Sequence, residues 1–234
     1  IITDKLFLHG NFKLKILCIT GQKRSGKDTA LDFIAKNHNV IYYKLAHEIK
    51  SAIVYGFLDE YTYEDIDGKT EVDREEILNV NQSEINYYFN NAVDYLIDIG
   101  LNVPLSKKGL TEFINSYPIN SWSIRTFMQR LGTDFVCNKC DELFWVRLAI
   151  KNYADNLNPE VEYFIIPDVR QDWEIDSIRK LGGVIVHVKR DSINKNVSID
   201  NHSTERELPI KSGDIIINNN SSLEEFYNTI PKYI

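Results

Sequence analysis

The spacing of apolar and polar residues along the chain predicts buried strands separated by helices. Five short apolar runs have the length of buried strands, at residues 14–19, 40–43, 163–167, 184–188 and 214–218. Three further segments have apolar residues at helical spacing, at residues 29–36, 45–53 and 223–227. Because strands alternate with helices and no repeat or linker separates them, we predict an α/β fold whose five-stranded sheet is mainly parallel and flanked by helices.

A long insertion interrupts this alternation at residues 59–121. It has few runs of β-type alternation and is rich in asparagine and tyrosine, so it is predicted to be mostly helical. Its first part, residues 59–76, holds nine acidic residues against Lys69 and Arg74, which gives it a charge of −7. We interpret this acidic segment as a solvated surface, and we predict a single domain over residues 1–234 that includes the insertion.

Residues 122–153 form the longest helical stretch of the sequence. Ser121 or Ser123 is placed to cap its first helix, which begins with Ile124. Gly132-Thr133-Asp134 is expected to interrupt the stretch before a second, largely buried helix begins.

Composition and charge exclude several classes of protein. The net charge is −7, and residues 59–76 account for all of it, so no broad basic face for polymeric nucleic acid is expected. With 43% hydrophobic residues the chain can bury a core, but no apolar run approaches the roughly 20 residues that span a membrane. Three cysteines and no visible secretory signal favour a reducing compartment, and we expect a cytoplasmic protein without membrane association.

A candidate phosphate-binding loop follows the first predicted strand. Gly21 and Gly26 allow the backbone to turn where a Cβ atom would clash, so that successive N–H groups and the start of the next helix can face one anion. Lys27 adds a positive charge there. The usual phosphate loop has Ser or Thr directly after this lysine, whereas this chain has Asp28 and places Thr29 one residue later. The residues predicted to bind the nucleotide phosphates are Gly21, Lys23, Arg24, Ser25, Gly26, Lys27, Asp28 and Thr29.

A second group of polar residues follows the apolar run at residues 163–167. Asp168 stands where a phosphate-loop enzyme places the acid that manages the magnesium shell, and Arg170 is close enough in sequence to serve a phosphate group. The alternative is that Asp168 or Asp172 caps the next helix. A cap does not exclude a role in the site, so Asp168 is a candidate for both.

Residues 190–212 form a polar segment with several cations among asparagine and serine. This composition fits either a mobile lid over a polyphosphate or an ordinary surface loop. We predict a lid.

Two tetrapeptides match patterns of GTP-binding switches, but their positions argue against that class. Residues 138–141 match the guanine-reading pattern, and residues 65–68 match the second switch pattern. In such switches these patterns follow strands of the sheet, whereas here the first lies in helical sequence and the second in the acidic insertion. Cys137 and Cys140 have the spacing of a metal or redox pair, but no histidine lies near them in sequence and helix packing is the expected role.

Several separated motifs together resemble one known family. In chain order they are residues 21–29, Arg125 with residues 128–129 and 131–134, residues 145–146, Pro167-Asp168 with residues 170–172 and Glu174, His202 with residues 204–205 and 208–209, and Gly213-Asp214. This ordered set resembles the deoxynucleoside monophosphate kinases of tailed bacteriophages, and it is more specific than a phosphate loop alone. The resemblance weakens over residues 59–117 and in the first dozen residues.

The resemblance implies a fold like that of nucleoside monophosphate kinases, with a helical region that binds the acceptor. It implies transfer of a phosphoryl group from ATP to a deoxynucleoside 5′-monophosphate, for phage DNA precursor synthesis in the host cytoplasm. Lys27 and the loop amides would hold the β- and γ-phosphates, and Thr29 would support phosphate or Mg²⁺. Asp28 or Asp168 would orient magnesium-bound water.

The resemblance also implies roles on the acceptor side. Arg125 and Arg170 would clamp the acceptor phosphate or the transferring group, while Arg130, about 140° from Arg125 around the helix, would form a salt bridge or lie at the rim. Trp145 would stack on the acceptor base or be a buried core tryptophan, and Glu174 would accept from sugar or base or fix Arg170. The predicted catalytic residues are Lys27, Arg125, Asp168 and Arg170, and the predicted substrate-binding residues are Arg125, Gln129, Arg130, Trp145, Asp168, Arg170 and Glu174.

Two other functions stay open on the residues alone. Another small-molecule kinase of the same fold, such as a dephospho-coenzyme A kinase, would consume a pantetheine-containing acceptor. A non-catalytic nucleotide-binding protein would bind ATP and transfer nothing. Related kinases make a homodimer an expectation, but the sequence specifies neither the oligomeric state nor the bases accepted.

Overall fold

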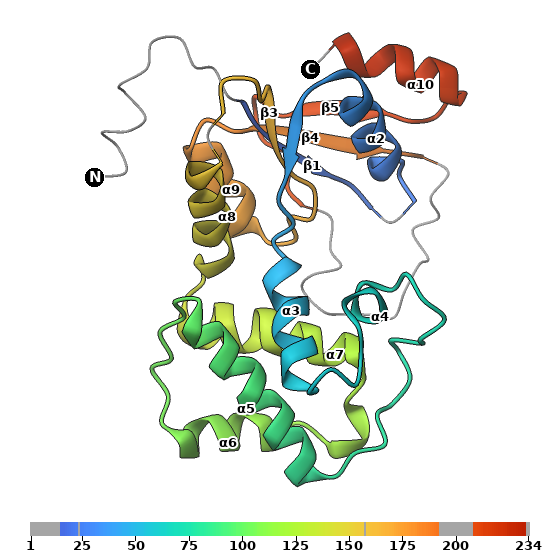
Figure 1. Cartoon of the computed structure of the whole chain (residues 1–234). Helices are drawn as coiled ribbons and strands as arrows, with labels where there is room; N and C mark the ends of the chain where they lie inside the picture. Colours follow the sequence, from blue (N-terminus) through green and yellow to red (C-terminus); the bar gives the residue numbers. More distant parts are fainter. Residues whose placement is uncertain (1–14, 23, 157, 192–207, 233–234) are drawn as a thin grey trace. The chain divides into compact units, whose positions relative to one another are not determined.

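The computed structural model of the chain describes residues 15–22, 24–156, 158–191 and 208–232. The chain divides into two compact units, one formed by Ile1–Leu45 with Val146–Ile234 and the other by Ala46–Trp145 (Figure 1). The helical insertion predicted at residues 59–121 lies inside the second unit. Lys23 and most of the segment predicted to be a lid, residues 192–207, lie outside the described residues.

A five-stranded parallel sheet forms the centre of the first unit (Figure 1). Its strands are, in spatial order, β2 (Val40–Tyr42), β3 (Tyr163–Ile166), β1 (Lys15–Thr20), β4 (Val184–Lys189) and β5 (Ile215–Asn218). Every neighbouring pair is parallel, so the predicted strands are confirmed and the sheet is wholly parallel. Cys18 of β1 is opposite Ile166 of β3 and Ile185 of β4, which places the carboxyl ends of these three strands next to one another.

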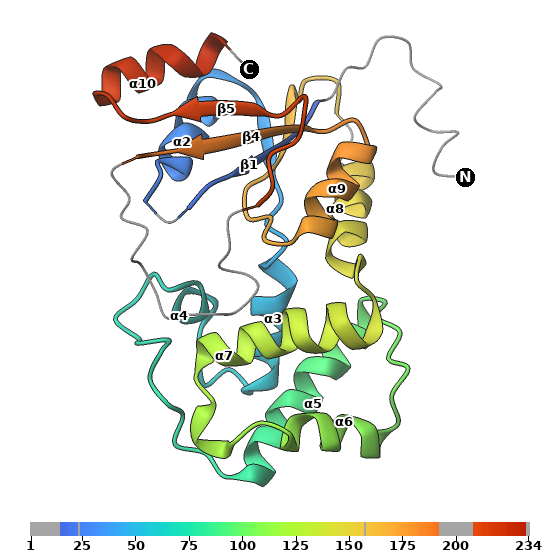
Figure 2. The ribbon, with the colours of Figure 1, turned by 180° about the vertical axis from the view of Figure 1, so that it is seen from behind.

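Helices cover both faces of this sheet. On one face, α2 (Lys27–Asn37) and α10 (Leu223–Thr229) bury residues such as Ile34 and Phe226 against the core side chains of the strands. A short 3₁₀ turn, η4 (Ile230–Lys232), follows α10. The other face carries α8 (Phe144–Asp155) and α9 (Asp172–Lys180), seen from behind in Figure 2. There Tyr153 of α8 packs edge-on against Phe164 of β3, whose neighbours along the strand point to the opposite face.

The second unit is helical. Its elements are α3 (His47–Gly56), α4 (Tyr63–Asp67), α5 (Gln82–Asp98), α6 (Lys107–Asn115), the 3₁₀ turn η1 (Ile119–Ser121), α7 (Ile124–Gln129) and η2 (Arg130–Cys140). Helix α3 packs mainly on α5, and Phe89 of α5 lies at the centre of a ring cluster with Trp122, Phe127 and Phe135. The hydroxyl of Ser123 accepts the N–H of Thr126, which confirms one of the two predicted caps of α7.

The expectation that Gly132-Thr133-Asp134 interrupts the helix is wrong. The chain passes from α7 directly into η2, a π-helix that includes these residues. A Cβ atom on Gly132 would lie 2.7 Å from Cδ1 of Ile49 in α3, so the glycine allows two helices to approach closely and does not break one. The Cys137 thiol donates to the Gly132 carbonyl, five residues earlier, at 3.2 Å.

Candidate functional site

The predicted phosphate loop connects β1 to α2 at the carboxyl edge of the sheet. It turns sharply because the N–H of Ser25 donates to the carbonyl of Gln22 at 3.0 Å, and Arg24 and Gly26 have left-handed backbone, with φ of 69° and 99°. Helix α2 then begins at Lys27, so the N–H groups of its first turn have no carbonyl partner inside the helix. Such a turn, ending in a helix N-terminus, presents backbone donors to an anion.

The side chains after the loop are charged and accessible. Lys27 Nζ donates to Asp28 Oδ1 at 3.0 Å, with 23% of the lysine side chain and 89% of the aspartate side chain exposed. An ion pair this exposed contributes little to stability and is easily exchanged for a stronger anion. Thr29 is half-buried one residue further on. Lys27 is therefore held near the loop without being committed to a structural role.

Asp168 follows β3 at the carboxyl edge of the sheet. The parallel register, with Cys18 opposite Ile166, puts the end of β3 at the same edge as the end of β1, where the phosphate loop begins. The predicted alternative, a cap on α9, does not apply, because that helix begins at Asp172 and its capping residue is Gln171. Asp168 Oδ1 instead accepts the N–H of Leu45 at 2.8 Å.

Glu174 holds the segment that follows Asp168. Its Oε2 accepts the N–H of Arg170 at 2.8 Å and that of Gln171 at 3.0 Å, and the residue is 5% exposed. Of the roles left open for Glu174, the structure therefore shows the one of fixing Arg170, through the backbone, while Arg170 itself is exposed. The pKa of Glu174 is raised to about 7; burial is the largest cause and the negative charge of Asp168 adds to it, while the two backbone N–H groups oppose the rise.

This raised pKa gives a testable dependence of stability on pH. The folded protein binds the Glu174 proton more tightly than the unfolded chain, so this contribution to the free energy of unfolding is full below pH about 4.5 and disappears as the pH rises through about 7. Glu174→Gln keeps the acceptor oxygen but cannot ionise. Between pH 5 and pH 8, urea unfolding should show the wild type losing on the order of 2 kcal/mol more stability than the variant. Parallel stability curves for the two proteins would contradict a buried, ionisable Glu174.

Arg125 lies at the start of α7 in the second unit. Its Nε is 3.2 Å from Oε1 of Glu75, and its backbone N–H donates to the Arg74 carbonyl at 2.9 Å. The side chains of Arg125 and Glu75 are 28% and 66% exposed, so water reaches the pair. Glu75 belongs to the acidic segment interpreted as solvated surface, and no sequence signal marked it as the partner of a predicted phosphate ligand.

Arg130 does not lie at a rim. The residue is 9% exposed, and its guanidinium carbon is 4.3 Å from the ring centre of Tyr117 and 4.2 Å from that of Trp122. Nη2 donates to Ser121 Oγ at 2.8 Å, while Nη1 is buried and has no hydrogen-bond partner within the described part of the chain. Of the two roles expected for Arg130, a salt bridge or the rim, the rim is therefore wrong, because the cation gains from contact with two aromatic rings inside the fold. Gln129, the residue before it, is half-buried.

Trp145 is part of the interior. It is 3% exposed, and its Nε1 donates to the Gly132 carbonyl at 3.1 Å. Both the ring and its polar group are thus satisfied within the protein. Of the two roles left open by the sequence, the structure shows a core tryptophan and not an exposed ring on which a base could stack.

Other polar residues of the second unit have internal partners. His47 Nδ1 lies 2.9 Å from the hydroxyl of Tyr63, and the buried Lys50 pairs with Asp67 of α4. Residues 65–68, one of the two GTPase-like patterns, end α4, with Gly68 in left-handed conformation as its cap. Residues 138–141, the other pattern, lie at the end of η2. As the sequence indicated, neither of the two patterns comes directly after a strand of the sheet.

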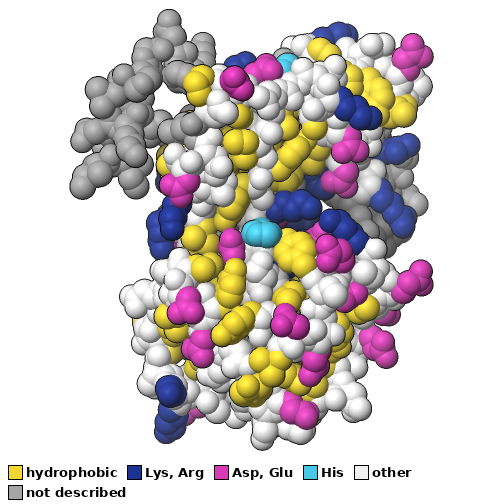
Figure 3. Space-filling model, viewed as in Figure 1, with side chains coloured by type: hydrophobic (Ala, Val, Ile, Leu, Met, Phe, Trp, Pro, Cys, Tyr) yellow, Lys and Arg dark blue, Asp and Glu magenta, His cyan; other side chains and the backbone are white. Residues whose placement is uncertain are grey.

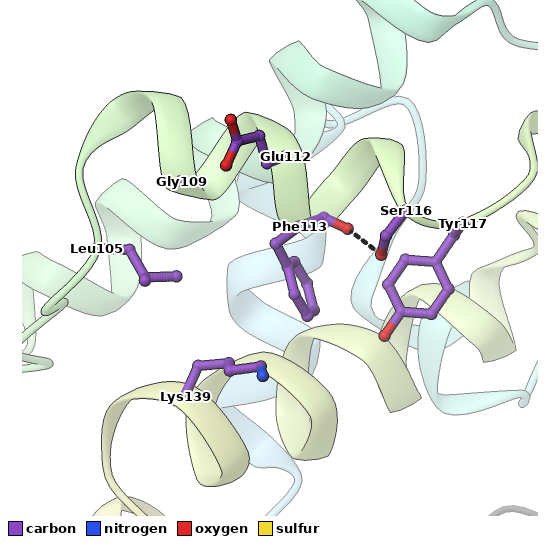
Figure 4. A pocket seen from close by; sticks show the side chains of 7 residues that line it. All are labelled: Leu105, Gly109, Glu112, Phe113, Ser116, Tyr117 and Lys139. Atoms are coloured by element: carbon purple, nitrogen blue, oxygen red, sulfur yellow. Dashed lines mark hydrogen bonds between the residues drawn. The ribbon is translucent and has the colours of Figure 1, made fainter.

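A pocket of about 450 Å³ opens within the second unit. It is lined by Leu105, Gly109, Glu112, Phe113, Ser116, Tyr117 and Lys139. Figure 4 shows the rings of Phe113 and Tyr117 and the side chain of Lys139 around this hollow. None of the predicted site residues lines the pocket.

The surface gives further constraints on partners. On the face shown in Figure 3, acidic and basic side chains are interspersed. Within the part of the chain that the structure describes, no helix is long and apolar enough to cross a membrane. The same part contains no group of three or more His, Cys, Asp or Glu side chains placed to hold a metal ion.

Comparison with known proteins decides the family. The model of one family, described as "Deoxynucleotide monophosphate kinase", matches residues 15–230. The chain belongs to the deoxynucleotide monophosphate kinase family. This result confirms the resemblance that the sequence motifs indicated.

Two phage members of the deoxynucleotide monophosphate kinase family are similar to this protein over almost the full chain. A protein of Enterobacteria phage T4 with that name is 36% identical over 243 residues, which cover 93% of this chain and 97% of the relative. The protein of the same name from Escherichia phage RB69 is 34% identical over 247 residues, covering 94% of this chain and all of the relative. A putative member from Acanthamoeba polyphaga mimivirus is 34% identical over 122 residues, 45% of this chain and 58% of the relative.

Proposed function

We propose that this protein transfers the γ-phosphoryl group of ATP to a deoxynucleoside 5′-monophosphate, which yields ADP and the deoxynucleoside diphosphate. The observation that carries the proposal is the phosphate loop between β1 and α2, found in a chain that matches named deoxynucleotide monophosphate kinases over more than nine-tenths of its length. The phage relatives also support activity in the cytoplasm of a bacterial host. The homodimer expected from related kinases stays a prediction.

The phosphate loop would bind the donor. Backbone N–H groups around Ser25 and Gly26 and at the start of α2 would hold the β- and γ-phosphates, and Lys27 would exchange its exposed contact with Asp28 for a phosphate oxygen. An oxygen of the acceptor phosphate then attacks the γ-phosphorus while the bond to the β–γ bridging oxygen breaks and ADP leaves. This reaction needs no covalent enzyme intermediate, so positioning and charge neutralisation are the protein's main contributions.

The residues beside the loop fit a magnesium ion that is held mainly by ATP. Mg²⁺ is usually bound by one or two carboxylates together with substrate phosphates and water, so the lack of a metal cluster among the described side chains is compatible with it. Asp168, just after β3 at the carboxyl edge of the sheet, and the hydroxyl of Thr29 would provide hard oxygen ligands, and the exposed Asp28 would provide a third. When bound with ATP, the ion would neutralise part of the phosphate charge.

On the acceptor side we assign Arg125 to the acceptor phosphate and Arg170 to the acceptor or the transferring group. Both have planar guanidinium groups that can bind two phosphate oxygens at once, and both are at least partly exposed. Glu174 acts through the backbone of Arg170. Gln129 stays a predicted substrate contact, whereas the burial of Arg130 and Trp145 supports structural roles for them.

One assay separates this proposal from its alternatives. The purified protein is given magnesium and ATP with each common ribo- and deoxyribonucleoside monophosphate, and with dephospho-coenzyme A, while ADP release is followed. We expect turnover with one or more deoxynucleoside monophosphates. Turnover only with dephospho-coenzyme A would show a different kinase, and ATP binding without turnover on any acceptor would show a non-catalytic nucleotide-binding protein.

A further inference from the structure

A side chain that follows the edge strand β5 reaches the phosphate loop. Asn219 directly follows β5, and its Nδ2 donates to the carbonyl of Ser25 at 2.9 Å. Its own backbone N–H donates to the carbonyl of Lys189, the last residue of β4, at 2.7 Å. Asn219 is half-buried. One residue thus connects the loop after β1 to the carboxyl ends of β4 and β5.

The loop is shaped to accept this side chain. A Cβ atom on Gly26 would lie 2.2 Å from Nδ2 and 3.2 Å from Cγ of Asn219, so only a glycine allows the amide to come this close. Gly26 also has φ of 99°, in the region that favours glycine. The contact between Asn219 and the loop therefore explains the glycine directly before the lysine.

Ser25 is held on both sides of its backbone. Its N–H donates to the Gln22 carbonyl, and its carbonyl accepts from Asn219. The residue is 1% exposed, and its Oγ is buried without a hydrogen-bond partner among the residues that the structure describes. Backbone groups and the Asn219 amide thus hold the conformation at Ser25.

The hydrogen bond to Ser25 also determines where the next N–H group points. The Ser25 carbonyl and the Gly26 N–H belong to one planar, trans peptide group, in which they face in opposite directions. With the carbonyl held toward Asn219, the Gly26 N–H is directed to the other side of the loop. This N–H is one of the donors that the proposed function assigns to the ATP phosphates.

We propose that Asn219 is a positioning residue for the phosphate loop, which orients the Ser25–Gly26 peptide group so that its N–H binds a donor phosphate. The inference rests on the proposed function only in assuming that the loop binds ATP. It predicts that Asn219 affects the binding of the polyphosphate part of the donor and has no direct contact with its base or sugar.

The experiment compares ATP with inorganic tripolyphosphate, which has no base or sugar. Both are titrated by calorimetry in the presence of magnesium into the wild type, Asn219→Ala, Asn219→Asp and Asn218→Ala. We expect Asn219→Ala to weaken both probes by the same factor, about tenfold, as for loss of one oriented hydrogen bond. Asn219→Asp, which keeps the size but offers no donor at pH 8, should weaken both at least as much. Asn218→Ala is the matched control. Asn218 is the exposed neighbour of Asn219, so this variant should bind both probes like the wild type.

Three results would overturn the inference. Wild-type affinity of Asn219→Ala for both probes would show that the loop does not depend on the amide. Weaker ATP binding with unchanged tripolyphosphate binding would show that Asn219 contacts the nucleoside. A lower melting temperature and a smaller binding-competent fraction, with unchanged affinity in that fraction, would show a structural role only. Because these titrations measure binding, a failure of phosphoryl transfer in the acceptor assay would count against the proposed function and not against this inference.

Discussion

Lys27→Ala is expected to lower kcat by about 10²- to 10³-fold, because it removes the positive charge that offsets the charge developing on the transferring phosphoryl group. The folded state should be almost unaffected, since Lys27 forms its ion pair with the highly exposed Asp28. Steady-state kinetics with saturating ATP and acceptor, together with thermal unfolding, measure the two effects separately.

Lys36→Ala is the matched control for this variant. Lys36 lies in the last turn of the same helix and is exposed. Its replacement by alanine changes the net charge and the composition of the helix by the same amount as Lys27→Ala, but it does not alter the loop. It should retain wild-type kcat. Near-normal turnover of Lys27→Ala, with an unchanged circular dichroism spectrum, would mean that the loop is not catalytic.

Arg125→Ala is expected to reduce kcat/KM for the acceptor by about 10²-fold, which corresponds to about 3 kcal/mol for a bidentate phosphate contact. Its melting temperature should change little, because the Arg125–Glu75 pair is open to solvent. Arg125→Lys should recover only part of the loss, since an ammonium group cannot form two parallel hydrogen bonds. The measurement is acceptor kinetics at saturating ATP.

Arg130→Lys should behave in the opposite way to Arg125→Ala, with a lower melting temperature and little change in acceptor kcat/KM. Its guanidinium lies over the rings of Tyr117 and Trp122, so the lysine variant should unfold at a lower temperature while the folded enzyme keeps most of its kcat/KM. A larger loss of acceptor kcat/KM for Arg130→Lys than for Arg125→Ala, measured below both melting temperatures, would reverse the assignment of the two arginines.

The strands and the loop could be predicted because their signals are local. Each strand is a continuous apolar run, as expected for strands covered on both faces, and the glycines and lysine of the loop follow the first of them directly. Asp168 was also predictable, since a polar residue just after a buried strand of a parallel sheet lies at its carboxyl edge.

The residues whose roles could not be predicted from the sequence depend on contacts with residues that are distant along the chain. Gly132 has the sequence signal of a helix breaker, but its role is set by Ile49, more than 80 residues earlier. The cation–π contacts of Arg130 depend on Tyr117 and Trp122, which precede the helix, and the ring nitrogen of the buried Trp145 finds its acceptor in the carbonyl of Gly132. Asn219 lies in a run of three asparagines typical of a loop, and nothing local indicates that it reaches Ser25.

The most direct test of phosphoryl transfer follows the phosphorus atom itself. ATP labelled with ³²P at the γ-position is incubated with the wild type, magnesium and each deoxynucleoside monophosphate, and the nucleotides are separated by chromatography. The proposed function predicts that label appears in a deoxynucleoside diphosphate in equal amount to the ADP formed. Label released only as inorganic phosphate, or retained in ATP with every deoxynucleoside monophosphate, would contradict it.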